Sequence, residues 1–368
     1  MESVKEDFPK NDDGARDPSY FGYYAQFVHQ QNMLSDIVRT QSYQRAILSN
    51  AQKHFKNKQV MDVGAGSGIL SYFAVQAGAE KLILSNEKNL WLHDKIEVFQ
   101  EKIERPLNIP KVDTIISEPI GVLLIHERML ESYLHARDHY LNPGGIMIPS
   151  TGTIFLAPFS DAGLWSQTMN KVRFWEQDNF YGVDFSPLAE DAKSEIFGQP
   201  IVGYFDYRLL MAPSVSYMVD FQTISSSQLK DFTIPIDWKF PFTGLVHGIA
   251  GWFDIDLGGV ILSTAPSAER THWQQVRFLF QEPLAVNAYE NIHGWMRLIV
   301  NDNRSYHIYA EVTKNSNSLS EPSECLNNFQ NLNLKRLEVE NFRRGIWNLH
   351  EQTYHYETSP MDLSRPEF

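Results

Sequence analysis

A short apolar strand, three closely spaced glycines and an apolar helix follow one another between Gln59 and Ser71. Glycines at positions 64, 66 and 68 allow the backbone to turn sharply and to pass close to a ligand, and amides at the helix start can donate hydrogen bonds. The G-x-G-x-G spacing differs from the G-x-G-x-x-G of a pyrophosphate binder, so it favours a nucleoside without a diphosphate. A purely structural turn is the alternative. The segment predicts the first βα unit of an α/β fold.

Two acids flank a turn that follows another apolar strand. The run 112–116 suits a strand buried on both faces of a parallel sheet, and Pro119 and Gly121 cannot continue it. Glu118 and Glu127 lie on either side of this turn, beyond the strand's carboxyl end, where ligands bind in open α/β sheets. Two facing carboxylates would hold a cation. Alternatively, Glu118 caps a helix and Glu127 forms a surface ion pair.

The rhythm of the chain changes near residue 149. Before it, strands at 96–99, 112–116 and 146–149 alternate with helical segments, which predicts a parallel α/β half. Between 151 and 312, short alternating runs separated by turn residues predict an all-β barrel or sandwich. An aromatic-rich insertion at 164–188 interrupts these runs and either packs internally or docks a second subunit.

The two ends of the chain have little to bury. Residues 1–18 are polar and acidic, which predicts a disordered leader rather than a signal sequence. Residues 314–368 are rich in Asn and Ser at first and predict a mostly disordered tail with one helix.

Overall charge bears on the kind of partner. Lys plus Arg total 32 against 45 for Asp plus Glu, and the net charge of −13 argues against nucleic acid or an anionic membrane as the main partner. It favours a basic partner, although a solvated acidic surface is the alternative. The only cysteine, Cys325, excludes an internal disulfide and fits a reducing compartment, the cytosol or the nucleus. No apolar stretch approaches the roughly 18 residues of a spanning helix, so we expect a soluble intracellular protein.

The spacing after Lys81 is unusual. A nucleotide site of this type expects an acid about 20 residues past the first glycine to hold the ribose, and the nearest is Glu87. Only residues 88–95 then separate Glu87 from the strand at 96–99. Parallel strands need a dozen or more residues between them, so either the second strand or the second helix is expected to be missing.

Four signatures occur in a fixed order. They are Tyr20-Phe21-x-x-Tyr24, the glycine turn, the Ser117–Gly121 run with the later Glu127–Tyr133 run, and Thr271-His272-Trp273. With this set the chain resembles the type I protein arginine methyltransferases, most nearly their coactivator-associated (histone) branch. The resemblance covers about residues 20 to 312.

The resemblance implies an α/β, Rossmann-like S-adenosylmethionine-binding domain followed by an all-β barrel domain with a helical dimerisation arm. A helical lid and the cofactor domain would occupy 19–149, the barrel 150–313 and the arm 164–188. In the family an acid after the second strand holds the ribose. Here residues 82–86 read like the end of the following helix, which suggests an internal deletion after Lys81.

Arginine chemistry fits the two acids. A guanidinium stays protonated at physiological pH, so its nitrogens are poor nucleophiles until the charge is drawn to one side. Glu118 and Glu127 would hold it by charge-assisted hydrogen bonds beside an activated methyl group. By resemblance, Trp273 would wall the substrate slot, and His272, paired with Asp36, would help to remove the proton. A histidine in a β-rich region is also commonly structural.

The resemblance also implies a set of cofactor contacts. Arg39 would pair with the carboxylate of S-adenosylmethionine, and the aromatic residues near position 20 would close over it as a lid. The full set comprises Tyr20, Phe21, Tyr24, Gln30, Met33, Arg39, Gly64, Gly66, Ile103, Glu104, Met129 and Ser132. No metal is expected.

The expected activity is methylation of arginine in histone tails and RNA-binding proteins to asymmetric dimethylarginine, supporting transcriptional regulation in the nucleus and cytoplasm. The resemblance further implies a homodimer with arginine-rich protein substrates and no direct nucleic acid or membrane partner. The alternative is a catalytically impaired relative, a dimerising binding partner without the ribose-binding strand. A nicotinamide-dependent oxidoreductase is disfavoured by the glycine spacing.

Overall fold

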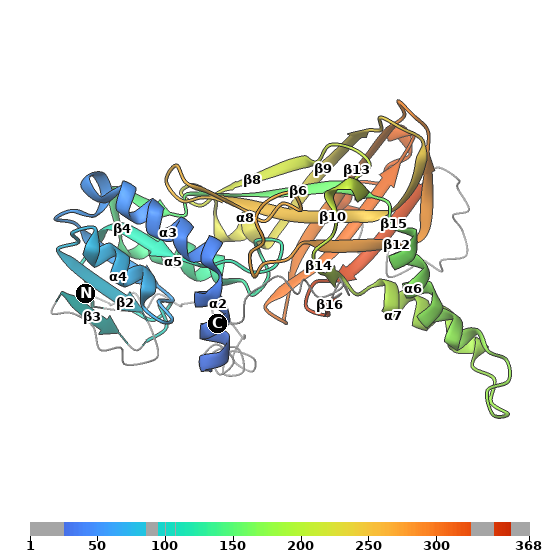
Figure 1. The fold of residues 1–368 in the computed structure, drawn as a ribbon, viewed down its shortest axis with the longest axis horizontal. Helices are drawn as coiled ribbons and strands as arrows, with labels where there is room; N and C mark the ends of the chain where they lie inside the picture. The colour runs from blue at the N-terminus through green and yellow to red at the C-terminus, as the bar shows by residue number, and fades with distance from the viewer. Residues whose placement is uncertain (1–25, 86–94, 100, 107, 325–341, 355–368) are drawn as a thin grey trace, which may run out of the picture.

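The structure is a computed structural model that describes residues 26–85, 95–99, 101–106, 108–324 and 342–354. An α/β unit lies beside a larger β unit, from which a helical arm projects (Figure 1). No helix within these residues is long and apolar enough to cross a membrane. Several expected features fall outside the described ranges: the leader, Tyr20, Phe21, Tyr24, Glu87 and Cys325.

Two helices precede the glycine turn, α2 (Phe27–Ser35) and α3 (Ile37–Ser49). Asp36 lies between them and caps α3, because its Oδ1 accepts a hydrogen bond from the Arg39 backbone N–H at 2.9 Å. The residues that α3 buries recur three and four positions apart and so share one face, from Arg39 to Ile47. A single π turn, η2 (Ala51–Phe55), follows.

The α/β unit contains a five-stranded parallel sheet in the order β3-β2-β1-β4-β5. At its centre, Met61 of β1 pairs with Ile83 of β2 on one side and Ile115 of β4 on the other. This confirms the expected parallel α/β fold. The elements are β1 (Gln59–Val63), α4 (Ile69–Gln76), β2 (Lys81–Ser85), β3 (Ile96–Phe99), β4 (Val112–Ser117), α5 (Met129–Tyr140) and β5 (Leu141–Ile148).

The expectation that the second strand is missing is wrong. Residues 81–85 form β2, which lies between β1 and β3 and pairs with both in parallel. Leu82 and Ile83 are buried, and a short apolar run of this kind suits either a helix end or a strand covered on both faces. Pairing with β1 and β3 makes this run a strand rather than a helix end. The second strand is therefore in place, and residues 86–94, where a second helix would follow it, lie outside the described ranges.

The β unit contains a seven-stranded and a four-stranded sheet. In the first, the path is β16-β7-β12-β10-β6-β8, with β11 paired to β10; in the second it is β15-β14-β13-β9. Contacts between β8 and β9 and between β12 and β15 close the two sheets around one core, as a barrel requires. The strands are β6 (Thr151–Phe159), β7 (Ile201–Val202), β8 (Val215–Asp220), β9 (Asp231–Lys239), β10 (Gly244–Asp256), β11 (Ile261–Ser263), β12 (Val276–Val286), β13 (Asn291–Asn301) and β14 (Ser305–Thr313).

The insertion is helical and forms the arm in Figure 1. It runs through α6 (Ala162–Arg173), η3 (Phe174–Glu176), η4 (Ser186–Leu188) and α7 (Ala189–Phe197). The rings of Phe174, Phe180 and Phe185 pack on one another near its tip, with centroids 5.3 to 6.3 Å apart. Tyr181, at the same tip, is 94% exposed.

The prediction of a mostly disordered tail is wrong for residues 342–354, which contain two strands. Residues Phe342–Asn348 form β15, which pairs antiparallel with β14, and Thr353–Tyr354 form β16. Trp347 is 1% exposed and donates from Nε1 to the Leu279 carbonyl at 3.2 Å. Because β14 offers an open edge to pair with, tertiary context orders a segment that looks weakly structured in sequence.

Candidate active site

The loop from Glu118 to Arg128 connects β4 to α5 and folds back on itself. Gly121 and Leu124 form an antiparallel bridge, and the Leu124 N–H donates to the Gly121 carbonyl at 3.0 Å. A Cβ on Gly121 would lie 2.0 Å from the His126 carbonyl oxygen, so only glycine fits there. The loop also holds non-glycine residues at positive φ, namely Leu123, Leu124, Glu127 and Arg128. Such conformations persist only where the surroundings enforce them, and they cluster at functional sites.

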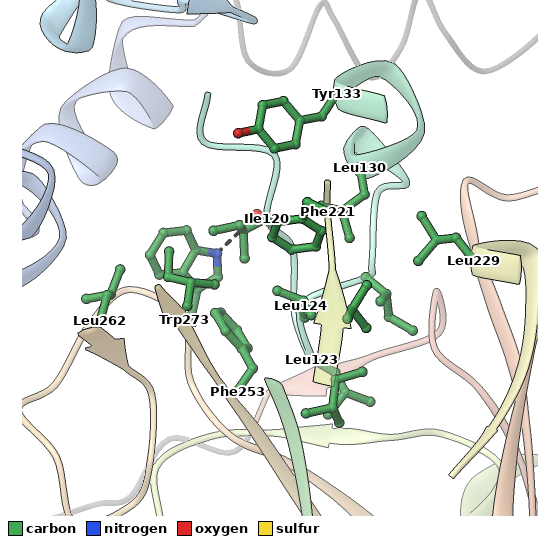
Figure 2. Close-up of a cluster of buried hydrophobic side chains, with 14 of the residues drawn as sticks. Ile120, Leu123, Leu124, Leu130, Tyr133, Phe221, Leu229, Phe253, Leu262 and Trp273 are labelled. Carbon is green, nitrogen blue, oxygen red and sulfur yellow. Dashed lines mark hydrogen bonds between the residues drawn. The ribbon is translucent and has the colours of Figure 1, made fainter. Parts of the chain in front are cut away.

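Apolar packing around the loop holds these residues at positive φ (Figure 2). Leu123 and Leu124 are buried among side chains of both the α/β unit and the barrel, including Phe221 and Phe253. Trp273 donates from Nε1 to the Ile120 carbonyl at 3.2 Å, drawn as the dashed line. Since Trp273 is only 4% exposed, the structure places it as a support of the loop.

Glu118 lies at the start of the loop and is paired with Arg39. The Arg39 Nε and Nη2 atoms donate to Glu118 Oε2 at 3.1 and 2.7 Å, and the two side chains are only 8% and 12% exposed. Burial lowers the pKa of Arg39, but the Glu118 carboxylate outweighs burial and raises it. Arg39 therefore stays charged. The resemblance implied a cofactor carboxylate as its partner, whereas in this structure the partner is one of the two expected catalytic acids.

His272 and Asp36 are in contact, as the resemblance implied. Asp36 Oδ2 accepts from the His272 backbone N–H at 2.6 Å and from the ring Nδ1 at 2.8 Å. A carboxylate only accepts, so Nδ1 of the ring carries a proton, and in the neutral tautomer compatible with this contact Nε2 is the acceptor. Burial raises the pKa of Asp36, but hydrogen bonds from His272 and Arg39 outweigh burial and lower it.

Arg39 joins these two pairs into one network. Its side chain binds Glu118 and its backbone N–H binds Asp36, which in turn binds His272. The members come from the loop after β4, from α3 and from the barrel loop before β12. No sequence pattern indicates this link, because the two side chains that form the ion pair are 79 positions apart.

The glycine turn after β1 packs against two expected cofactor residues. Gly64, Gly66 and Gly68 have φ of 73°, 52° and 77°. A Cβ on Gly64 would lie 3.3 Å from Met129 Cε, and one on Gly66 would lie 3.4 Å from Gln30 Oε1. The turn therefore lies directly beneath Met129 and Gln30, which come from α5 and α2.

Asp62 in β1 is a buried acid directly before the glycine turn, and the sequence analysis assigned it no role. It is 1% exposed and accepts a hydrogen bond from Ser71 Oγ at 2.5 Å. Burial raises its pKa to about 7. The available signal was an acid within an otherwise apolar strand directly before the glycines.

The structure also describes the remaining expected site residues. Ser132 of α5 donates to Glu104 Oε1 at 2.5 Å, and Ile103 beside it is 4% exposed, so these three lie together. The Met33 carbonyl accepts from Arg39 Nη1 at 3.4 Å. Glu127 is half-buried, with φ of 74°, at the end of the loop that begins with Glu118.

Comparison with known proteins gives the family. Residues 150–317 match the family model described as the arginine methyltransferase oligomerization subdomain. A probable histone-arginine methyltransferase CARM1 from Oryza sativa subsp. indica is 44% identical over 309 residues, or 79% of this chain and 58% of the relative. A histone-arginine methyltransferase CARMER from Drosophila yakuba is 44% identical over 322 residues, 82% of this chain and 60% of the relative. The chain thus spans less than two thirds of these relatives.

Solved structures agree. The Trypanosoma brucei PRMT1 enzyme-prozyme heterotetrameric complex with AdoHcy has a TM-score of 0.69 at 26% identity, covering 88% of this chain and 99% of that one. Arabidopsis thaliana protein arginine methyltransferase 10 gives 0.71 at 28%, covering 80% and 94%. The fold of this chain, a glycine-turn α/β unit joined to a barrel that carries an arm, is thus similar to the folds of solved protein arginine methyltransferases. The chain belongs to that family.

Proposed function

We propose that this chain is an S-adenosylmethionine-dependent protein arginine N-methyltransferase. The single observation that carries the proposal is the buried network of Glu118, Arg39, Asp36 and His272 beside the glycine turn. It presents a carboxylate for a guanidinium and a histidine whose Nδ1 is bound to Asp36 so that Nε2 is left to exchange a proton, next to a turn suited to a nucleoside.

The residues at the glycine turn fit S-adenosylmethionine. Positive φ at Gly64 and Gly66 and their close contacts with Met129 and Gln30 make a cradle that side chains on the glycines would fill. Ile103, Glu104 and Ser132 would lie toward the adenine, and Met33 would help to shape the methyl-bearing end. When bound, this group supplies a methyl on a sulfonium. The lid role of Tyr20, Phe21 and Tyr24 is part of the proposal.

The chain's own acids would act on the substrate. Glu118 and Glu127 would bind the guanidinium and draw its charge to one side, leaving one terminal nitrogen free to react. Arg39 would keep Glu118 oriented. His272 Nε2, with Asp36 fixing the ring, would take up the proton, and Trp273 would wall the slot.

The net charge of −13 favours basic substrates, and curated relatives are named histone-arginine methyltransferases. We propose histone tails and RNA-binding proteins as substrates, asymmetric dimethylarginine as the type I product, and action in the nucleus and cytoplasm. A homodimer formed through the arm is proposed because residues 150–317 match an oligomerization subdomain. Neither nucleic acid nor membrane is proposed as a direct partner.

The test is methyl transfer by the purified full chain, with methyl-labelled S-adenosylmethionine and core histones. We expect label in histone arginines, asymmetric dimethylarginine in the hydrolysate, and no label in a peptide whose arginines are changed to lysine. Titration with S-adenosylhomocysteine gives a separate readout. Absence of both transfer and saturable binding at millimolar ligand would overturn the proposal.

The alternative of an impaired relative rested on a missing ribose-binding strand and its acid; β2 lies between β1 and β3, which favours the enzyme, and Glu87 lies outside the described residues. We therefore keep a single proposed function.

A further inference from the structure

Tyr204 lies where the arm returns to the barrel. It follows β7, whose Ile201 and Val202 pair with Arg277 and Val276 of β12. The Gly203 N–H then donates to the Gln275 carbonyl at 3.0 Å. These bonds fix the chain that enters Tyr204 directly alongside the segment that carries Thr271, His272 and Trp273.

Two contacts hold the Tyr204 side chain against that segment. Its hydroxyl donates a short hydrogen bond to the Thr271 carbonyl. The guanidinium of Arg270 lies 4.4 Å from the ring centroid, within the range of a cation–π interaction. Burial raises the pKa of Tyr204, so the phenol keeps its proton and stays a donor.

The Thr271 carbonyl immediately precedes His272 in the chain. Thr271 is 3% exposed, and its Oγ1 donates to the Trp273 carbonyl at 2.9 Å, so the turn around His272 is closed from within. Tyr204 holds this turn from one side, and Asp36 holds it from the other through the His272 N–H and Nδ1. The orientation of His272 therefore depends on both contacts.

We propose that Tyr204 is a positioning residue for the transferase site. Its hydroxyl fixes the Thr271 carbonyl and thereby the orientation in which His272 meets Asp36. A series of contacts thus connects the returning arm, through Tyr204 and the His272 turn, with Asp36, Arg39 and Glu118. The predicted effect on turnover rests on the proposed function. The predicted effect of the Tyr204 hydroxyl on the His272 turn does not depend on activity.

The test compares Tyr204→Phe, which removes only the hydroxyl, with Tyr207→Phe. Tyr207 lies three positions away in η5 (Tyr207–Leu209) and is 57% exposed, so it serves as a matched control. The first readout is hydrogen exchange of the His272 backbone amide, the group that donates to Asp36. We expect exchange about 3- to 10-fold faster in Tyr204→Phe, the factor that follows from one lost hydrogen bond, and unchanged in Tyr207→Phe.

The second readout is steady-state kinetics. In Tyr204→Phe we expect kcat to fall by about the same factor while KM for the histone peptide stays within about twofold, because substrate-binding groups are untouched. Arg270→Gln leaves the hydroxyl but removes the cation over the ring, and should give a smaller change of the same sign in both readouts. Sedimentation velocity and thermal melting establish that each variant keeps its assembly and fold.

The outcomes separate the inference from the proposed function. Unchanged His272 exchange in Tyr204→Phe would overturn the inference, whether or not the protein is active. Faster exchange with unchanged kcat would also overturn it, since the loop would then not govern turnover. A wild-type chain without methyl transfer would contradict the proposed function, and with it the proposed role in turnover; the exchange data would then test only the structural link.

Discussion

Asp36 and His272 are 236 positions apart and are joined by two hydrogen bonds, at 2.6 and 2.8 Å. One residue caps the helix α3 and the other lies in a loop of the barrel. The site is thus assembled from both halves of the chain, and neither half contains it alone.

Replacing Asp36 with asparagine keeps a good helix cap but removes the anion that faces His272. We expect the free energy of unfolding at pH 7 to fall by about 1–2 kcal/mol, as for loss of a charge-assisted hydrogen bond. The folded-state pKa of Asp36 is lowered, so its stabilisation is present above the ordinary carboxyl value of 3.8 and is lost as the pH falls through the folded pKa. Denaturant unfolding should show wild type and variant converging below about pH 4. A constant difference down to pH 2 would contradict this.

Glu118→Gln leaves the buried Arg39 guanidinium without its counter-ion. Breaking a buried pair typically costs about 3–5 kcal/mol, so the melting temperature should fall by many degrees. Glu101→Gln is the control, because its pair with Arg105 is exposed and should contribute less than about 1 kcal/mol. Equal, small shifts in calorimetry for both variants would show that the Arg39 pair is not the stabilising contact that its burial implies.

Glu127→Gln tests the second acid of the loop. The amide keeps the size of the side chain but cannot draw the guanidinium charge, so we expect kcat to fall roughly 10²- to 10³-fold. Binding of S-adenosylhomocysteine should stay within a few-fold of wild type in isothermal titration. Retained turnover would refute the role of the two acids.

His126 predicts an acid-side loss of stability. Burial and the nearby His350 lower its pKa to about 4 from an ordinary value of 6.5. Between these values the unfolded chain takes up a proton that the folded chain does not, so the free energy of unfolding should fall by up to about 1.4 kcal/mol per pH unit as the pH decreases. In His126→Gln this contribution should disappear, whereas His139→Gln on the exposed side of α5 should keep it. Identical profiles for all three proteins would exclude His126 as the cause.

The arm tip predicts the assembly state. Tyr181 and Val183 are 94% and 51% exposed there, and a second subunit docked on the arm would cover them. Tyr181→Asp combined with Val183→Asp should convert the proposed dimer to monomer in sedimentation velocity. Met218→Asp, an exposed position on β8, is the control and should leave the assembly unchanged.

Sequence patterns predicted the parts of the fold that local chemistry decides. The glycine turn and the strand at 112–116 have a spacing that only a βα unit explains, and both appear as expected. The run at 81–85 was misinterpreted because a short apolar segment has the same composition in a helix and in a buried strand. β15 was missed because its order comes from the edge of β14 rather than from its own residues.

The site shows the same division. Sequence motifs predicted Glu118, Asp36 and His272 as site residues. The pairing of Arg39 with Glu118, in contrast, depends on how α3 packs against the end of β4. The contact of Tyr204 with Thr271 likewise arises from the register of β7 on β12. Long-range register is set by the whole core, which no local pattern encodes.

The match to the oligomerization subdomain ends at residue 317, while the barrel continues through β15 and Trp347. A fragment cut at the matched boundary would keep the pairing of β14 with β13, but it would leave the other edge of β14 unpaired and a void at the position of the Trp347 indole. Unpaired edges of this kind recruit strands from other copies. We therefore expect such a fragment to aggregate on expression, and an expressed form of this protein should extend past residue 354.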